Sequence, residues 1–397
     1  MKKCFILLIL LCICSCAQQS PVRKAKIPPP SPIPEIPIQT MGKPLLPTQE
    51  SITSLYGNLL SKINVSKSSF NPSQGEEVAI YYTLSEPAKV TVNIYDPDQG
   101  FIRALISEES IKQGDQTIIW DGKDMDGKVV PNESYFFTII GEDEKGSKEI
   151  YDPTTFSGGV GQDITAADIN PQDQTITYKM PEMGRVMIRM GIQGGPLLNT
   201  LVDWEPRTNG VVTEYWNGKD TDNLIDLYNH PKFKMIISYF TLPENSVITY
   251  GNKTMVYREY KKSHTVDRPK NPERTTSILK SSPHYRLPRT EDYVPDIKMD
   301  FVNTQGTNND GNVILKGKTL VKVDLDEKDK VLFKNQQFEI VFFLDHNFYA
   351  EDETGYAPFN WVWDLSNVNE GEHIFTVNLS SFKDQVGVLS LKVRVIK

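Results

Sequence analysis

The chain repeats itself at a constant spacing of 96 residues. This shift pairs Tyr82 with Tyr178, Leu105 with Leu201 and Trp120 with Trp216. It also pairs Gly122 with Gly218, Lys123 with Lys219 and Asp124 with Asp220. Because an ungapped register over more than forty residues is unlikely by chance, the repeat predicts two tandem copies of one module, at residues 62–152 and 160–253.

Short runs of alternating apolar and polar residues fill the first copy. Residues 78–84 and 90–95 alternate in this way, and Asn-Pro, Glu-Pro and Asp-Pro-Asp-Gln-Gly clusters separate them. Similar short runs return between residues 319 and 396. This pattern is typical of β-sandwiches, so the predicted fold class is all-β, with three sandwiches in tandem and the third at 296–397.

The first residues resemble an export signal. Lys2 and Lys3 precede an apolar run from Phe5 to Ile13 that is too short to span a bilayer permanently. The following Ile13-Cys14-Ser15-Cys16-Ala17 resembles the bacterial lipobox, which predicts a signal peptide at 1–15 and lipidation of Cys16. A plain secretory signal is the alternative.

A Pro-rich spacer is expected at residues 16–61, which cannot bury a core and favours extended conformations. Ala17, rather than Asp, follows Cys16, which in the enterobacterial sorting scheme favours the outer membrane. The expected location is therefore the cell envelope, as an outer-membrane lipoprotein facing either the periplasm or the surface.

Composition argues against several functional classes. All four cysteines lie within the first sixteen residues, so the mature chain offers no disulfide framework or thiolate site. The five histidines are scattered, and neither a catalytic motif nor a phosphate loop is present. The net charge of −8 gives no reason to expect nucleic acid. We therefore expect no enzyme activity, cofactor or metal.

One motif suggests a family. Residues 90–100, Arg103-Ala-Leu, Gly114 and the run from Trp120 to Tyr135 resemble the Ig-like module of flagellar hook-capping proteins. The second copy keeps Trp216-Asn-Gly-Lys-Asp-Thr-Asp but has Asn223 in place of Gly127. The first copy departs at Asn132-Glu133, where the family usually has a small residue and glycine. The resemblance implies a fold and a spacer or docking role.

The repeated tryptophan and loop residues are expected to be structural. A tryptophan at a strand end caps a core, while glycine takes positive φ and aspartate bonds backbone amides in a tight loop. The residues concerned are Trp120, Gly122, Asp124, Gly127, Trp216, Gly218 and Asp220. Calcium is the alternative, because Asp124, Asp126, Gly127 and Glu133 follow EF-hand spacing, but Gly122 would occupy the first position.

A basic segment follows the second copy. Residues 256–289 contain nine Lys or Arg against three acids, so 254–295 is predicted to be an extended basic linker. Tyr257, Tyr260 and Tyr293 interleave with its basic residues. The candidate partner-binding residues are Arg258, Lys261, Lys262, Arg268, Tyr285, Arg286 and Arg289. The linker either binds an acidic protein or anionic lipid, or it lies against the acidic sandwiches of its own chain.

The sequence favours a membrane-tethered structural or interaction lipoprotein that docks on another envelope or surface protein through its linker and sheet edges. The third module is similar in pattern to bacterial Ig-type domains of secreted enzymes and adhesins. The alternative function is therefore a glycan-binding or adhesin-type surface protein that uses Tyr356, Trp361 and Trp363 as a platform. Alternation of the tryptophans between core and strand edge is the other interpretation.

Overall fold

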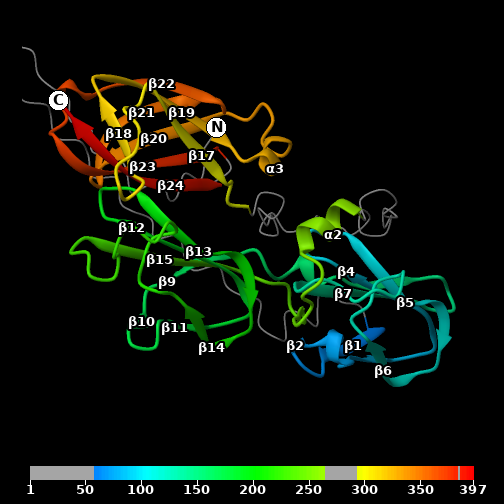
Figure 1. Ribbon diagram of the computed structural model, residues 1–397. Helices are drawn as coiled ribbons and strands as arrows, with labels where there is room; N and C mark the ends of the chain where they lie inside the picture. The colour runs from blue at the N-terminus through cyan, green and yellow to red at the C-terminus, as the bar shows by residue number, and fades with distance from the viewer. Residues whose placement is uncertain (1–57, 264–292, 383–384) are drawn as a thin grey trace, which may run out of the picture.

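The computed structural model describes residues 58–263, 293–382 and 385–397. These residues form three β-sandwiches, each made of two facing sheets with a hydrophobic core (Figure 1). The prediction of an all-β chain of tandem Ig-like sandwiches is confirmed.

The first part of the chain contributes eight strands to the first sandwich. They are β1 (Leu60–Val65), β2 (Ser69–Phe70), β3 (Val78–Leu84), β4 (Ala88–Tyr95), β5 (Phe101–Ile111), β6 (Gly114–Trp120), β7 (Ser134–Glu142) and β8 (Lys148–Tyr151). One sheet has the order β1-β3-β6, and the other contains β2, β7, β4 and β5, with β8 beside β7.

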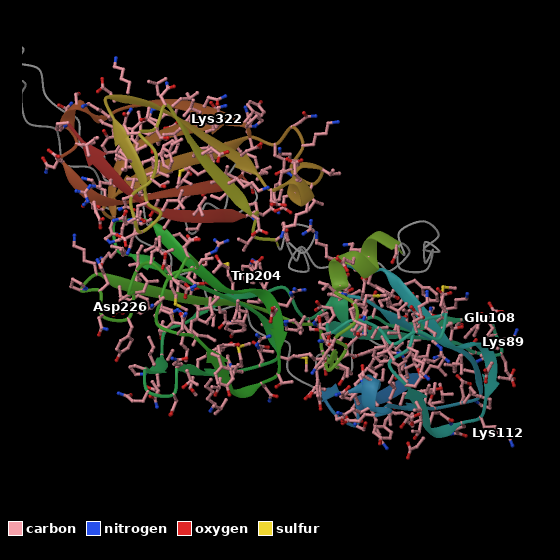
Figure 2. The ribbon with its side chains drawn as sticks, in the orientation of Figure 1. Lys89, Glu108, Lys112, Trp204, Asp226 and Lys322 are labelled. Carbon is pink, nitrogen blue, oxygen red and sulfur yellow. The ribbon has the colours of Figure 1, made fainter. Side chains whose placement is uncertain are left out.

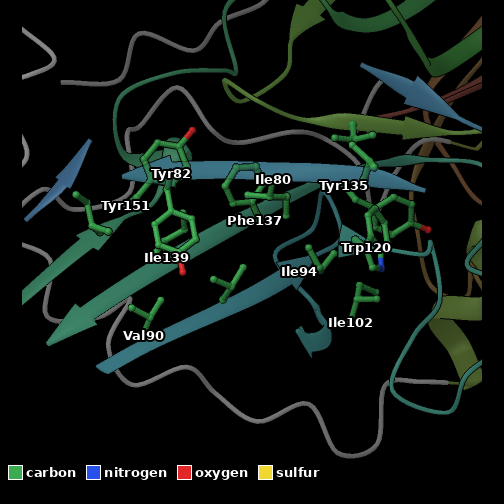
Figure 3. Packing of buried hydrophobic residues seen from close by; sticks show 14 of the residues in the cluster. Ile80, Tyr82, Val90, Ile94, Ile102, Trp120, Tyr135, Phe137, Ile139 and Tyr151 are labelled. Atoms are coloured by element: carbon green, nitrogen blue, oxygen red, sulfur yellow. The ribbon is translucent and has the colours of Figure 1, made fainter. Parts of the chain in front are cut away.

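Alternation in β3 and β4 fills the core between these sheets. Ile80, Val90 and Ile94 point inward and are at most 2% exposed (Figure 3). Trp120 closes one end, with its ring 5.5 Å from Phe70 and 5.3 Å from Tyr135 in edge-on geometry. Each large apolar side chain buried in this way contributes about 1.5–3 kcal/mol.

The second sandwich repeats the first. Its strands are β9 (Gly161–Ile164), β10 (Ala167–Asn170), β11 (Thr175–Met180), β12 (Gly184–Ile192), β13 (Leu197–Arg207), β14 (Gly210–Tyr215) and β15 (Phe233–Thr241). The sheets have the orders β10-β11-β14 and β13-β12-β15-β9. Strands β5 and β13 lie 96 residues apart, and the irregularities of the β4–β5 pairing recur at the equivalent positions of the β12–β13 pairing.

The repeat extends to backbone conformation. Glu108 and Trp204, which are 96 residues apart, have φ values of 51° and 53°. Glu108 lies exposed at the outer end of the first sandwich, whereas Trp204 is 9% exposed and lies inside the assembly (Figure 2). The same bulge therefore presents a charge to solvent in one copy and an aromatic ring to the interior in the other.

After the second sandwich, the chain returns to the first. β16 (Val247–Thr249) joins the larger sheet of the first sandwich, antiparallel to β7 and parallel to β2. The helix α2 (Tyr257–Ser263) then packs on the same sandwich, and its Tyr260 belongs to that core. The expected end of the second copy at residue 253 is therefore wrong. The expectation of an extended linker is also wrong at 257–263, because these residues form α2 and the side chain of Tyr260 is buried in the core of the first sandwich.

The third sandwich consists of β17 (Ile297–Val302), β18 (Val313–Lys316), β19 (Lys318–Leu325), α3 (Glu327–Lys330), β20 (Phe338–Leu344), β21 (Asn347–Gly355), β22 (Phe359–Asp364), β23 (Gly371–Ser381) and β24 (Val386–Ile396). Its sheets have the orders β17-β19-β22 and β18-β24-β23-β20-β21. It packs above the second sandwich, where β24 faces β13 (Figure 1).

Candidate interaction surfaces and module junctions

The repeated loops have the same internal hydrogen bonds. The indole Nε1 of Trp120 donates to the Lys123 carbonyl at 3.0 Å, and that of Trp216 donates to the Lys219 carbonyl at 2.8 Å. Gly122 and Gly218 both have positive φ, at 69° and 82°. A Cβ on Gly122 would lie 2.3 Å from the Cβ of Pro72, so this position requires glycine.

The loop aspartates accept backbone hydrogen bonds. Asp124 Oδ1 accepts from the amides of Asp126 and Lys128, and Asp220 Oδ1 accepts from the amide of Ile225. Gly127 has φ 75°, and Asn223 takes the same left-handed conformation at 59°. Asparagine tolerates this region better than most residues, which explains how the second copy keeps the loop without its glycine.

The carboxylates of the calcium alternative are engaged with protein groups. Asp124 Oδ2 accepts from the Tyr260 hydroxyl at 3.0 Å, and Glu133, 2% exposed, pairs with Arg185. Within residues 58–263, 293–382 and 385–397, no group of three potential metal-ligating side chains is found.

The start of the basic segment binds its own first sandwich. Tyr260 is 2% exposed, and the Tyr257 hydroxyl donates to Asp98 Oδ2 at 3.1 Å. The ammonium of Lys261 forms an ion pair with the same carboxylate. Of the two alternatives for the linker, packing against the acidic sandwiches of the same chain holds for these residues.

Arg258 lies toward the third sandwich. Its guanidinium is 3.6 Å from the centre of the Tyr293 ring, and the Tyr293 hydroxyl donates to Asp329 Oδ1 at 2.6 Å. A cation over an aromatic face contributes about 0.5–1 kcal/mol at an exposed site and more when desolvated. The remaining candidates, Arg268, Tyr285, Arg286 and Arg289, lie outside the described residues, as do the Lys262 side chain and Cys16.

Buried polar contacts join the first and second sandwiches. Glu133 Oε1 and Arg185 Nη1 are 3.5 Å apart, with both side chains at most 4% exposed. Asn132, the neighbour of Glu133, forms two hydrogen bonds with the backbone of Asn252, which lies between β16 and α2. The two residues that depart from the hook-capping pattern are therefore the ones that form these contacts.

The second and third sandwiches are joined by side chains that pair with backbone groups. The Asn378 amide exchanges two hydrogen bonds with the backbone of Leu197, at 2.8 and 2.9 Å. Asp222 Oδ2 accepts from the Ser390 amide at 2.7 Å. The rings of His230 and His346 pack edge-on with centres 5.4 Å apart. Burial and the nearby His230 lower the pKa of His346.

A cavity of about 830 Å³ lies where the three sandwiches meet α2. Its walls include Arg185, Arg207, Tyr257, Arg258 and Tyr293. Arg207 binds Glu214 at 2.8 Å, and Arg185 binds Glu133, so much of the basic lining is already paired with carboxylates.

The proposed aromatic platform for a glycan is not formed. Trp363 is fully buried, and Trp361 is half-buried; their rings stack on Phe375 at 4.3 and 6.3 Å. Residues two apart on a strand share a face, so both tryptophans point to the core. This geometry also contradicts the alternation between core and edge. Tyr356, 51% exposed, is left without coplanar tryptophans beside it.

Asp345 pairs with a histidine distant in sequence. Its Oδ2 lies 2.6 Å from His373 Nδ1, while His373 Nε2 lies 2.9 Å from the Asn369 carbonyl. Burial opposes protonation of His373, but these two acceptors outweigh it and raise the pKa. Because both ring nitrogens face acceptors, the pair is suited to an imidazolium that connects β23 to the turn between β20 and β21.

No helix in the described part of the chain combines the length and apolarity needed to cross a bilayer.

Comparison with known proteins identifies the first sandwich. Residues 67–145 match the FlgD Ig-like domain family, which confirms the resemblance to the hook-capping module. The chain is 39% identical over 75 residues to the basal-body rod modification protein FlgD of Salmonella typhimurium. This match covers 19% of the chain and about a third of that relative, and a protein of Salmonella typhi matches equally. The matched family is a structural domain and does not indicate catalysis.

Solved structures give weaker likenesses. FlgD from P. aeruginosa aligns over 38% of this chain and 98% of its own, with 15% identity and a TM-score of 0.19. A tetra-tandem repeat from the extending region of a large adhesion protein aligns over 85% of this chain and 74% of its own, with 12% identity and a TM-score of 0.18. Neither likeness contributes to the assignment of function.

Proposed function

We propose that this protein is a membrane-tethered lipoprotein that docks on another envelope or surface protein, as a structural component without catalytic activity. The observation that carries the proposal is the way in which the sandwiches are joined. β16 and α2 pack on the first sandwich, and buried or partly buried contacts connect the second sandwich with both neighbours. Such contacts favour a rigid arm of three sandwiches over three domains that move independently.

The tether is inferred from the sequence. Acylation of Cys16 would anchor the chain, and the Pro-rich residues 16–61 would hold the arm away from the bilayer. Location at the outer membrane and a role in assembling a surface filament or complex belong to the same proposal. The FlgD Ig-like domain supports the structural role.

The contacts of α2 reduce the set of candidate docking residues. Lys261, Tyr257 and Tyr260 bind the first sandwich, so they are unsuited to holding a partner. The proposed contact residues are Lys262, Arg268, Tyr285, Arg286 and Arg289. The positive charge of the four basic residues among them suits an acidic protein surface.

A pull-down from host membranes tests docking. The tagged full chain would be compared with a variant that carries glutamate at Lys262, Arg268, Arg286 and Arg289. A matched control would carry glutamate at four exposed lysines on the sandwiches, Lys89, Lys112, Lys234 and Lys322, with the same change in net charge. We expect a stoichiometric protein that the control retains and the first variant loses. Recovery of the same protein by all three chains would contradict docking through the linker.

A further inference from the structure

The second sandwich has an open sheet edge at β14. This strand pairs with β11 over six consecutive positions without a bulge, and it is the last strand of its sheet among the residues that the structure describes. Val211 and Tyr215 on this strand are 76% and 79% exposed, and Thr213 between them is also exposed.

The backbone of the same three residues faces the open edge. The Trp216 amide donates to the Gln174 carbonyl at 2.8 Å, so residue 216 points toward β11. Backbone direction alternates along an antiparallel strand, so the N–H and C=O groups of Val211, Thr213 and Tyr215 point away from β11. The close hydroxyl contact of Thr177 and Thr213, at 3.3 Å, fits the non-hydrogen-bonded pair that this assignment requires.

The equivalent edge in the first sandwich is protected. There, β6 places Asp115 where β14 has Val211, and charged side chains on an edge discourage pairing with another strand. On β14, the one charged residue is Glu214, whose carboxylate binds Arg207 and Tyr178. In the second copy, Val211 replaces this edge charge, and Tyr215, 79% exposed, stands where the first copy has Ile119, 49% exposed.

We propose that β14 pairs in antiparallel fashion with β14 of a second copy of this chain, about a two-fold axis at Thr213. The strand is self-complementary in this register. Val211 of each copy lies opposite Tyr215 of the other, which is a favourable β-branched and aromatic pair, and the two Thr213 residues face each other. Each of these residues forms two backbone hydrogen bonds with its counterpart, one through its N–H and one through its C=O. The outward-facing backbone groups of both edges are then paired.

Electrostatics permit this arrangement and favour it over a partner with a charged strand. Across β11, Val211 is paired with Lys179, so the new row contains Lys179, Val211, then Tyr215 and Thr175 of the second copy. In this register, no like charges lie opposite each other. A partner strand with acidic or basic residues at these positions would lose the apolar pairs.

Cysteine cross-linking in host membranes tests the pairing and its register. In an antiparallel hydrogen-bonded pair, the Cα atoms are about 5.5 Å apart, which a disulfide can span. The full chain with Thr213→Cys is expected to give a covalent dimer on mild oxidation. Thr117→Cys, the equivalent exposed position on β6, and Val211→Cys, displaced from the axis, should give none. The unsubstituted chain controls for the natural cysteines.

A second variant separates specific pairing from chance collision. Adding Val211→Lys and Tyr215→Lys to the Thr213→Cys chain should lower the dimer fraction about tenfold, because four lysines then face one another. All four substituted positions are exposed, so the fold is expected to persist. The proposal is overturned by no Thr213→Cys dimer, by equal dimer from Thr117→Cys or Val211→Cys, or by a cross-link to a different protein. These outcomes are independent of the linker pull-down.

Discussion

The helix α2 is an integral part of the first sandwich, and Tyr260 is the residue through which this can be tested. Its side chain is 2% exposed, and its hydroxyl donates to Asp124 in the loop that follows Trp120. Tyr260→Phe keeps the ring but removes the hydroxyl from a carboxylate that is 1% exposed. Tyr260→Ala also removes the ring from the core.

The expected losses follow from these contacts. Removing a hydrogen bond to a buried charged group costs about 1.5–3 kcal/mol. Truncating a large buried aromatic residue to alanine costs about 3–5 kcal/mol. If the amides exchange through opening of the first sandwich, a loss of about 1.5–3 kcal/mol means that they should exchange about 10- to 150-fold faster in Tyr260→Phe.

Hydrogen exchange measured by mass spectrometry gives this value strand by strand. Hydrogen exchange of the peptides that cover β4 and β6 should be faster in both variants, and fastest in Tyr260→Ala. Exchange of peptides from β23 in the third sandwich should not change. Tyr250→Phe, at a residue that is 47% exposed, is the matched control and should leave every peptide unaffected. Exchange of β4 and β6 within about twofold of the unsubstituted protein in Tyr260→Phe would refute the integral role of α2.

Three further predictions concern the junctions and the histidines. Glu133→Ala should lower stability to urea by about 3–5 kcal/mol, because it leaves Arg185 buried without this carboxylate, whereas Asp126→Ala at an exposed ion pair should cost less than about 1 kcal/mol. His346 has a lowered pKa and lies near His230, Asp345 and Asp220, so its contribution to stability is present above about pH 6.5 and is lost as pH falls. His346→Asn, a substitution that tolerates the φ of 68° at this position, should reduce the fall in melting temperature on the acid side of a pH profile. An unchanged fall would contradict this. His373 has a raised pKa, so its contribution is present below about pH 6.5 and is lost as pH rises through the folded value; His373→Gln should remove this alkaline loss in the same assay, and its persistence would show that another group causes it.

The repeat made the first two sandwiches predictable. A 96-residue register fixes which positions share a role, and the loops, bulges and positive φ values follow it. Asn223 is an example, because the sequence showed a lost glycine, while the structure shows an asparagine in the same left-handed conformation.

Contacts between modules were beyond what local patterns could predict. β16 and α2 are short, and their places are determined by sites on the first sandwich, more than 100 residues earlier, such as Asp124 for Tyr260. Both interpretations of Trp361 and Trp363, an exposed platform and an alternation between core and strand edge, were wrong, because a spacing of two places the residues on one face of the strand. Asn132 and Glu133 were the available signal, since both depart from the family pattern and both hold other parts of the chain.

The most direct test of the central claim combines lipid labelling with partner recovery. Cells that express the full chain, Cys16→Ala or Cys14→Ala would be fed a clickable fatty acid, and each chain would be isolated from the membrane fraction. We expect the full chain and Cys14→Ala to be labelled, to stay with membranes and to recover the same protein partner, and Cys16→Ala to lose all three properties. A Cys16→Ala chain that remains labelled, or that recovers the partner from membranes as well as the full chain does, would contradict a tethered docking protein.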